Sequence, residues 1–548
     1  MTVQTNKNRL SVALIARDEE GTLPQTLASV EKIADEIVVL DTGSADNTLA
    51  AAVRFGARVV SFDWCEDFSA ARNALWDQLQ GDWVLWLDAG ERIDTADAKL
   101  IHGCVNEQID QERLFMLTVE VPAAAQGASN EQILQPRLVP NRQDIRFEGP
   151  LRETLLRSAQ AVGLMVETLP VTLRKTAAYR ETQRCKGRAY RDLMILEAKC
   201  EREGTLAPRE FNACGEAYAE LNDTEKARDA FEAAINVASH GSTEMLEGYY
   251  GLLTTYNNLA DHKDVFLNTC IEALEIFPFD AQLHLAMGHC LQNRGELDLA
   301  ARSFSTAVEY GQVNLETWHL SEIAEVPTIC LSTVMQLQGK QESANMLIDE
   351  AIRRSVHSPR FIRHAIELKV KRAEVDDALR LVSELDLPEP EAAAMCEAVR
   401  GACAAAQNNL LDALGHLENA FTNGCHEAFC LRWLLVTLTS SQHYDAATEV
   451  LEHWKEREGE TKEIVNFEAA IQQRKAISAA LAEAKTETDN MMLPEEEDEE
   501  EPINVVTDVD DDRYWRVDQS TTITDACAPA WPNHQKSVDT TDFASEAG

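Results

Sequence analysis

Acidic side chains follow three short apolar segments near the start of the chain, where each segment ends. They are Asp18 after residues 10–16, Asp41 at the end of residues 36–41, and Asp88 at the end of residues 82–88. If the segments are parallel strands, their carboxyl ends meet at one edge of a sheet, where such sheets bind ligands. Carboxylates there could accept hydrogen bonds from a nucleotide base and ribose, or hold a divalent cation. No GxGxxG or Walker loop occurs, so neither dinucleotide nor P-loop binding is indicated.

The hydrophobic periodicity from residue 10 to about 175 alternates between the strand and helix patterns. Strands are predicted over residues 10–16, 36–41, 57–62 and 82–88, helices over 23–33, 46–55 and 68–79, and further strands over 114–121, 135–140 and 166–173. This alternation predicts an α/β domain with parallel strands and crossover helices, which we assign to residues 1–180. Asp46 stands at the start of a predicted helix, where a helix cap is the favoured interpretation.

Residues 185–480 are almost wholly helical in pattern and contain an internal repeat. One copy consists of Phe211, Cys214, Gly215, Tyr218, Ala227, Phe231 and Ala234, and another of His284, Met287, Gly288, Leu291, Ala300, Phe304 and Ala307. The alanine that opens the last triplet recurs at Ala344, Ala378, Ala413 and, approximately, Ala446. A repeat of roughly 34 residues with small residues at helix crossings predicts a tetratricopeptide-like solenoid.

The composition excludes several classes of partner. The formal net charge of −43 disfavours nucleic acid and anionic membrane surfaces, and no apolar run is long enough to span a membrane. The thirteen cysteines form no CxxC pair, which predicts reduced thiols and a cytoplasmic location. Residues 485–548 include seven consecutive acidic residues, at 495–501, and are predicted to form a disordered acidic tail.

Four ordered motifs in the first domain resemble the family 2 glycosyltransferases. The motifs are Arg17-Asp-Glu-Glu20, Asp41-Thr-Gly-Ser-Ala-Asp-Asn-Thr48, Phe68-Ser-Ala-Ala-Arg-Asn73 and Gly81-Asp-Trp-Val-Leu-Trp-Leu-Asp88. The chain looks most like the bacterial subgroup that carries tetratricopeptide repeats after the catalytic domain. The resemblance covers residues 10–175 and, more loosely, 185–480.

The resemblance implies a glycosyltransferase A-type (GT-A) fold and a nucleotide-sugar donor, commonly a UDP-sugar. The positions it implies for nucleotide-sugar binding are Asp18, Asp41, Ser44, Arg72, Asn73 and Asp88. Among them Asp41 would contact the base, Arg72 could place its guanidinium on the pyrophosphate, and Asp88 would approach the ribose.

Two positions depart from the family pattern. The acidic Asp-x-Asp motif reads Asp88-Ala-Gly90, and Arg152 stands where the subgroup usually has His. Three interpretations remain open: transfer without a metal, with Arg152 neutralising the pyrophosphate; an inactive, degenerate domain; or a Mg²⁺ or Mn²⁺ ion held by Asp88 and Glu91. The cofactor is therefore either none or a divalent cation.

If the domain is active, the resemblance implies a single displacement with inversion, in which a base removes the acceptor hydroxyl proton. Glu153 is the candidate base and Glu148 the alternative. Two functional classes follow. One is a glycosyltransferase whose repeats hold a protein or glycan acceptor, and the other is an interaction scaffold that binds protein partners through its repeats and carries a vestigial transferase domain.

Overall fold

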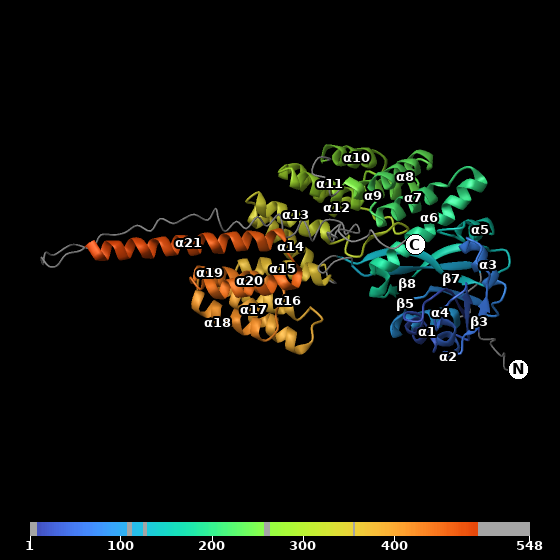
Figure 1. The fold of residues 1–548 in the computed structure, drawn as a ribbon, viewed down its shortest axis with the longest axis horizontal. Helices are drawn as coiled ribbons and strands as arrows, with labels where there is room; N and C mark the ends of the chain where they lie inside the picture. The colour runs from blue at the N-terminus through green and yellow to red at the C-terminus, as the bar shows by residue number, and fades with distance from the viewer. Residues whose placement is uncertain (1–7, 107–111, 124–128, 257–262, 355–356, 492–548) are drawn as a thin grey trace, which may run out of the picture. The chain divides into compact units, whose positions relative to one another are not determined.

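The computed structural model describes residues 8–106, 112–123, 129–256, 263–354 and 357–491 (Figure 1). These residues fall into two compact units. The first lies within Met1–Arg294 and Arg302–Ala324, and the second within Gly295–Ala301 and Glu325–Asp525. The first unit holds the α/β domain together with the first helices of the repeat region, and the second unit consists of the later repeats.

A single mixed sheet forms the α/β domain. Its strands are β1 (Leu10–Ala16), β2 (Glu36–Asp41), β3 (Arg58–Ser61), β4 (Trp83–Asp88), β5 (Glu91–Arg92), β6 (Arg113–Val121), β7 (Glu131–Pro140), β8 (Met165–Lys175) and β9 (His319–Leu320). The strand order is β3-β2-β1-β4-β7-β6-β8-β5, with β9 beside β7. The first four strands in this order run parallel, and β7 joins β4 in the antiparallel direction.

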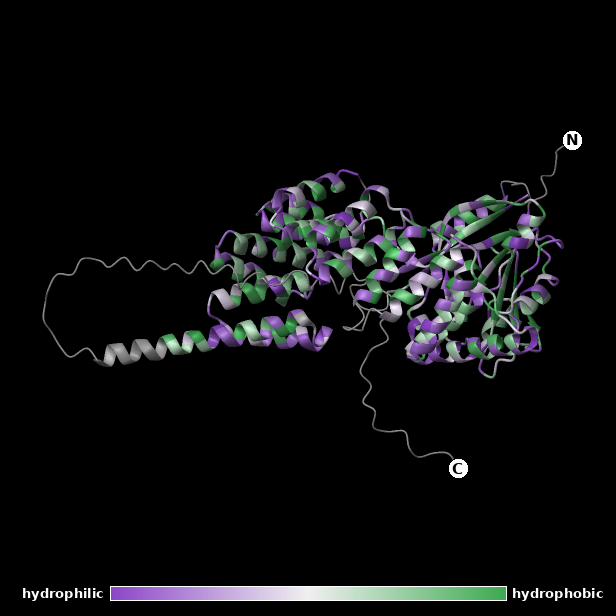
Figure 2. Ribbon diagram, turned by 90° about the horizontal axis from the view of Figure 1, so that it is seen from above, coloured by the Kyte–Doolittle hydropathy of each residue, from purple (hydrophilic) through white to green (hydrophobic). Residues whose placement is uncertain are grey.

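Two hydrophobic cores cover the two faces of the sheet. The helices that pack there are α1 (Leu23–Val30), α2 (Thr48–Arg54), α3 (Phe68–Trp76), α4 (Thr95–Asn106) and α5 (Leu156–Ala161). Along β1, Val12 and Leu14 join the core of α1, α2 and α4, whereas Ala13 joins the core of α3 and α5. Because side chains of a strand alternate between faces, a strand buried on both faces reads as a continuous apolar run. Figure 2 shows the strands largely in the hydrophobic colour.

The expected fold class is confirmed: an α/β domain precedes a long run of helices. The predicted strands at residues 10–16 and 36–41 match β1 and β2 to the residue. The strands β5 and β9 were not predicted, because two residues are too short to show a periodicity.

The first unit contains the first copies of the helical repeat. The 3₁₀ helix η1 (Ala177–Arg180) leads into α6 (Thr182–Glu203), α7 (Pro208–Glu220), α8 (Thr224–Val237), α9 (Thr243–Tyr256), α10 (Lys263–Ile276), α11 (Ala281–Asn293) and α12 (Leu297–Tyr310), of which residues 302–310 lie in this unit. The structure explains the small-and-large pattern of the repeat. A Cβ atom at Gly215 would lie 2.5 Å from the ring of Phe231, and one at Gly288 would lie 2.3 Å from the ring of Phe304. Glycine is therefore required where the paired helix inserts its phenylalanine.

The second unit continues the helical repeat. Its helices are α13 (Val326–Leu337), α14 (Gln341–Ile352), α15 (Pro359–Lys371), α16 (Val375–Val382), α17 (Glu389–Ala406), α18 (Leu410–Thr422), α19 (Ala428–Ser440), α20 (Tyr444–Glu458) and α21 (Lys462–Met491). Ala344, Ala378 and Ala413 are fully buried, as the repeat predicts. In the last copy Ala447, rather than Ala446, takes the buried position.

The predicted disordered tail starts at residue 485, but α21 continues to Met491. The rest of that tail, residues 492–548, lies outside the described residues. None of the described helices combines the length and the apolar character needed to cross a membrane.

The repeat helices of the first unit are joined to the sheet by backbone hydrogen bonds. Strand β9, which follows α12, pairs with β7, with Leu320 opposite Glu131 and His319 opposite Gln132. The Leu134 amide also donates to the Leu315 carbonyl, at 2.7 Å. The predicted domain boundary at residue 180 lies between β8 and α6, and thus inside the first compact unit.

Gly215→Ala tests the packing rule of the repeat. The added methyl group has no room against the ring of Phe231, so the free energy of unfolding should fall by about 1–3 kcal/mol. Gly187→Ala is the matched control, because Gly187 is an exposed residue within α6 with no atom near its Cβ position. It should raise the stability by roughly 0.5–1 kcal/mol through helix propensity. Thermal unfolding of both variants checks this, and equal shifts in Tm would contradict the packing argument.

Candidate functional site

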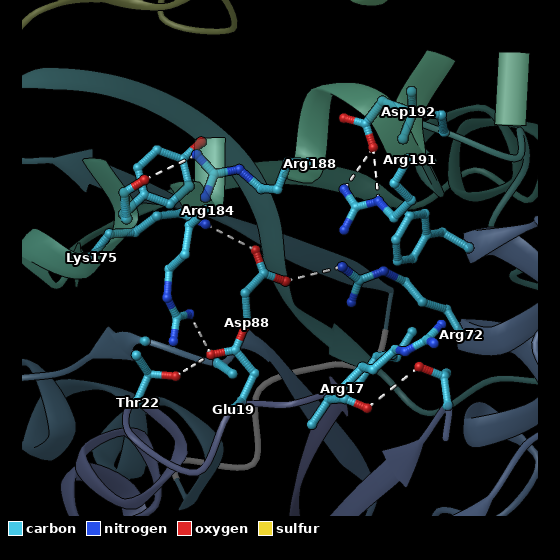
Figure 3. Close-up of a pocket in the computed structure, with 18 of the residues that line it drawn as sticks. Arg17, Glu19, Thr22, Arg72, Asp88, Lys175, Arg184, Arg188, Arg191 and Asp192 are labelled. Atoms are coloured by element: carbon cyan, nitrogen blue, oxygen red, sulfur yellow. Dashed lines mark hydrogen bonds and ion pairs between the residues drawn. The ribbon is translucent and has the colours of Figure 1, made fainter. Parts of the chain in front are cut away.

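A cavity of about 460 Å³ lies where β1 and β4 end (Figure 3). One wall consists of strand-end residues, among them Arg17, Thr42 and Asp88. Another wall is the N-terminal half of α6, which contributes Arg184, Arg188 and Arg191. The structure thus brings the ends of the parallel strands to one crevice, as the sequence predicts.

Asp88 is the centre of a cluster of ion pairs at the end of β4. Its carboxylate lies 3.1 Å from Arg72 Nη2, 3.2 Å from Arg137 Nη2 and 3.2 Å from Lys175 Nζ. Burial alone would raise the pKa of Asp88, but Arg137, Lys175 and Arg72 together hold that pKa well below its ordinary value. Asp88 is therefore an ionised carboxylate facing three cations.

Glu91 is fully buried behind Asp88. One of its oxygens accepts from the Asp88 amide at 2.9 Å, and the other lies 2.9 Å from Arg137 Nη2 and 3.4 Å from Lys175 Nζ. Burial raises the pKa of Glu91, against the opposing effect of Arg137. Both oxygens of Glu91 are thus engaged within the protein.

The predicted metal pair, Asp88 and Glu91, does not fit a divalent cation in this arrangement. Mg²⁺ and Mn²⁺ need several free oxygen ligands, whereas each of these carboxylates already faces cationic side chains. Gly90 supplies no side-chain ligand and has a φ of +91°, a conformation that favours glycine. The described residues contain no group of three or more His, Cys, Asp or Glu that could hold a metal ion.

Arg72 connects Asp88 with Glu153, the predicted base. Its Nε donates to the Glu153 carboxylate while its Nη2 donates to Asp88. The guanidinium also lies 5.3 Å from the ring centres of Trp86 and Phe147, which fix its plane. Three of the predicted site residues therefore lie together on one wall of the cavity.

The loops after β1 and β2 are joined by hydrogen bonds next to the cavity. The Asp41 carboxylate accepts from the amides of Gly43 and Ser44, each at 3.1 Å. The Ser44 hydroxyl accepts from the Asp18 amide at 3.0 Å, and Asp18 Oδ1 accepts from the Ala45 amide at 2.7 Å. Asp18, Asp41 and Ser44, three of the positions implied for nucleotide-sugar binding, thus form one connected rim. None of the three lines the cavity itself, whereas their neighbours Arg17 and Thr42 do. Asp46 accepts from the Thr48 amide just before α2, whose N-cap is Asn47, so it acts as a turn former beside the cap rather than as the cap itself.

Asn73 is tied elsewhere and is not among the residues that line the cavity. Its amide nitrogen donates to the Phe147 carbonyl and its oxygen accepts from the Phe147 amide, both at 3.0 Å. This pair holds α3 to the segment before Glu148. Glu148, the alternative base, is half-exposed and lies 3.5 Å from Arg157.

Arg152 lines the cavity but is held by the repeat helices. It forms ion pairs with Glu216 of α7 and, at 3.3 Å, with Glu247 of α9. These carboxylates neutralise the charge that the sequence assigns to a pyrophosphate. The position where the subgroup has His therefore serves as a bridge between the transferase-like domain and the repeats.

Several cationic residues of the site were not predicted: Arg137, Lys175, Arg184, Arg188 and Arg191. Arg137 stands inside the predicted strand at residues 135–140, and a charge within an apolar run is a signal for a buried partner. The three α6 arginines lie four and three residues apart, a spacing that indicates one helix face.

Glu91→Gln tests whether Glu91 is a structural counter-ion. The change removes a buried negative charge beside Arg137 and Lys175, so the free energy of unfolding should fall by about 3–5 kcal/mol. Asp144→Asn, at the exposed pair with Arg142, should leave the stability nearly unchanged. Urea unfolding in EDTA is the measurement. An unchanged Glu91→Gln variant would contradict the counter-ion role.

Glu247 should make the stability of the first unit depend on pH. Burial raises the pKa of Glu247 to about 7, although Arg152 opposes the shift. Because the folded value exceeds the ordinary value of 4.5, the contribution of Glu247 to stability is present at low pH and is lost as the pH rises to about 7. The stability of the wild type relative to Glu247→Gln should therefore fall by on the order of 2 kcal/mol across this range. Urea unfolding at a series of pH values checks this. Glu225→Gln, at an exposed position of α8, is the control and should show no such trend.

Comparison with known proteins finds a family match in the first part of the chain. Residues 11–96 match the family described as Glycosyl transferase family 2. A TPR repeat-containing protein of Synechococcus elongatus is 42% identical over 146 residues, which cover 26% of this chain and 35% of that protein. A glucosyl-3-phosphoglycerate synthase of Mycolicibacterium paratuberculosis is 40% identical over 91 residues, which cover 15% of this chain and 28% of that enzyme. The chain thus spans about a third of the length of these curated relatives.

A solved tetratricopeptide repeat protein from Parabacteroides merdae aligns with 50% of this chain and 98% of its own, at 14% identity and a TM-score of 0.37. Together with the repeat pattern and the helices described above, the sequence matches place this chain among proteins of two parts. Residues 11–96 match the family 2 glycosyl transferases, and helical repeats of the tetratricopeptide kind follow the domain that contains them.

Proposed function

We propose that this protein transfers a sugar from a nucleotide-sugar donor of the UDP-sugar class to an acceptor presented beside its repeats. The observation that carries the proposal is the meeting of three strand ends at one cavity. Asp88, Arg72 and Glu153 line that cavity as one connected cluster, and the Asp18–Asp41–Ser44 rim lies next to it through its neighbours Arg17 and Thr42. Glycosyl transfer in general is supported by the family match of residues 11–96.

The donor is proposed to lie across the strand ends. The nucleotide base would occupy the rim between the loops after β1 and β2, where Asp41 organises the turn. The ribose would approach Asp88, at the end of β4. Arg72 holds Glu153 and Asp88 together, so the sugar would face Glu153 on the same wall.

The proposed reaction is a single displacement with inversion at the anomeric carbon. Glu153 takes the proton of the acceptor hydroxyl, and the oxygen of that hydroxyl forms a bond to the anomeric carbon. The bond from the anomeric carbon to the diphosphate oxygen breaks, and the electron pair leaves with the nucleoside diphosphate. Because Asp88 and Glu91 do not fit a divalent cation as arranged, the proposal assigns no step to a metal ion.

The acceptor is proposed to be a protein or a glycan. A second cavity, of about 610 Å³, shares Arg72, Asp88 and Glu153 with the donor site and reaches α9 at Glu244 and Glu247. All of these residues lie in the first unit. An acceptor in this cavity would contact both the sheet and the first repeats. The predicted cytoplasmic location and a protein partner on the repeats remain predictions.

Asp41→Ala tests the donor site. In calorimetric titrations with EDTA present, UDP should bind the wild type and bind Asp41→Ala at least tenfold more weakly, because the turn that forms the base pocket loses its acceptor. Asp144→Asn is the control for a lost surface carboxylate. Failure of the wild type to bind UDP or any UDP-sugar, with EDTA or with Mn²⁺, would favour the scaffold with a degenerate domain.

Glu153→Gln and Glu148→Gln separate the two candidate bases. With a panel of UDP-sugars, Glu153→Gln should lower the rate of donor hydrolysis on the order of 10²-fold or more and leave UDP binding intact. Glu148→Gln should retain the rate, because Glu148 pairs with Arg157 outside the cluster. The opposite pattern would transfer the role of base to Glu148.

A further inference from the structure

We propose that the face of α6 formed by Arg184, Arg188 and Arg191 is a phosphate-binding wall for the diphosphate of the donor. This inference rests on the proposed function and deepens it. All three arginines line the 460 Å³ cavity from the side opposite the strand ends (Figure 3). Helix α6 lies outside residues 11–96, the part that matches the family, so the wall is an addition to the matched core.

The cavity carries an excess of positive charge. Its lining holds seven basic side chains, from Arg17, Arg72, Arg152, Lys175, Arg184, Arg188 and Arg191. It holds only four acidic side chains, from Glu19, Asp88, Glu153 and Asp192. The whole chain has a net charge of −43, so this local excess opposes the overall composition. A cavity of this charge attracts an anion.

Arg188 is the member of the wall best placed to receive that anion. Arg184 pairs with Glu19 at 2.9 Å, and Arg191 pairs with Asp192. Among the residues that the structure describes, no carboxylate forms an ion pair with Arg188. Its guanidinium donates to the Tyr179 carbonyl at 2.9 Å and lies 4.2 Å from the centre of the Tyr179 ring. Its position is thus fixed by contacts that place no carboxylate in an ion pair with it.

A phosphate group is the ligand that suits this wall. The planar guanidinium of arginine matches the oxygens of phosphate in paired hydrogen bonds. The ion pair of Arg184 with Glu19 anchors the wall just beyond the end of β1, beside the proposed nucleotide rim. Lys175, which contacts Asp88, places its ammonium 4.7 Å from the centre of the same Tyr179 ring. The wall is therefore linked to the loop after β1 through Arg184 and to the Asp88 cluster through Tyr179 and Lys175, and the diphosphate of the donor would lie along it.

The wall would also act in the proposed reaction. When the bond to the anomeric carbon breaks, negative charge develops on the departing diphosphate. Fixed cations near that charge stabilise it without rearrangement. The positive charge of Arg152 is less available for this role, because Arg152 already forms ion pairs with Glu216 and Glu247.

Calorimetric titrations of the full chain in EDTA test the inference with uridine, UMP and UDP. Arg188→Gln should bind UDP roughly tenfold or more weakly and bind uridine unchanged, because only phosphate contacts are lost. Arg188→Lys should fall between the wild type and Arg188→Gln. Lys186→Gln is the matched control: it removes one positive charge from an exposed position of α6 that does not line the cavity.

The outcomes are distinguishable. If Arg188→Gln binds UDP like the wild type while Asp41→Ala no longer binds UDP, the inference of a phosphate-binding wall is wrong and the proposed donor site stands. If uridine binding falls with UDP binding in a folded Arg188→Gln protein, the effect is not on phosphate and the inference fails. If the wild type binds no nucleotide, both the inference and the proposed function fail.

Discussion

The site depends on a buried cluster of balanced charges at the end of β4. Three carboxylates, from Asp88, Glu91 and Glu153, face three cations, from Arg72, Arg137 and Lys175. Charges of either sign are costly to bury alone, so each group needs its partners in place. The partners come from β4, β5, β7, β8, α3 and the segment after residue 150. The cluster therefore couples the position of each strand end to all the others.

This cluster also decides what the site can bind. Here the acidic groups are already paired with cations. Arg188 of α6 adds a cation to the cavity wall that forms no ion pair with a carboxylate in the described part of the chain. As arranged, the side chains that line the cavity carry more positive than negative charge, which favours an anion. A glycine at position 90 with a φ of +91° fits this arrangement, because it gives the turn its shape and adds no further acid.

In the first unit the repeat helices contact the sheet and the residues around the site. Arg152 reaches α7 and α9, and β9 extends the sheet beyond β7. Leu151 packs against Ile195 and Leu196 of α6 and Ala213 of α7 in one small core. Helix α6 is thus held by apolar contacts on one side while its arginines face the cavity on another. A helix that carries ligand contacts needs such support to keep its side chains in position.

The amino-acid sequence by itself determined the elements and their order. Continuous apolar runs and helical spacing predicted the parallel strands, the crossover helices and the repeat, because burial of apolar side chains is a local and periodic property. The small residues at Gly215 and Gly288 predicted close helix crossings for the same reason. The sequence also predicted that Asp18, Asp41 and Asp88 lie at one edge of the sheet, since parallel strands end together.

Only the tertiary structure decided how the charges are paired. Arg72 meets Glu153 across 81 residues of chain, Arg137 meets Glu91 across 46, and Arg152 turns to the repeats rather than to a pyrophosphate. Nothing in the spacing of these residues specifies the pairing, because an ion pair requires two side chains within about 4 Å whatever their separation in sequence. The same holds for the cavity wall formed by α6. The pairing of charges depends on three-dimensional distance, and that distance exists only once the strands and helices have packed.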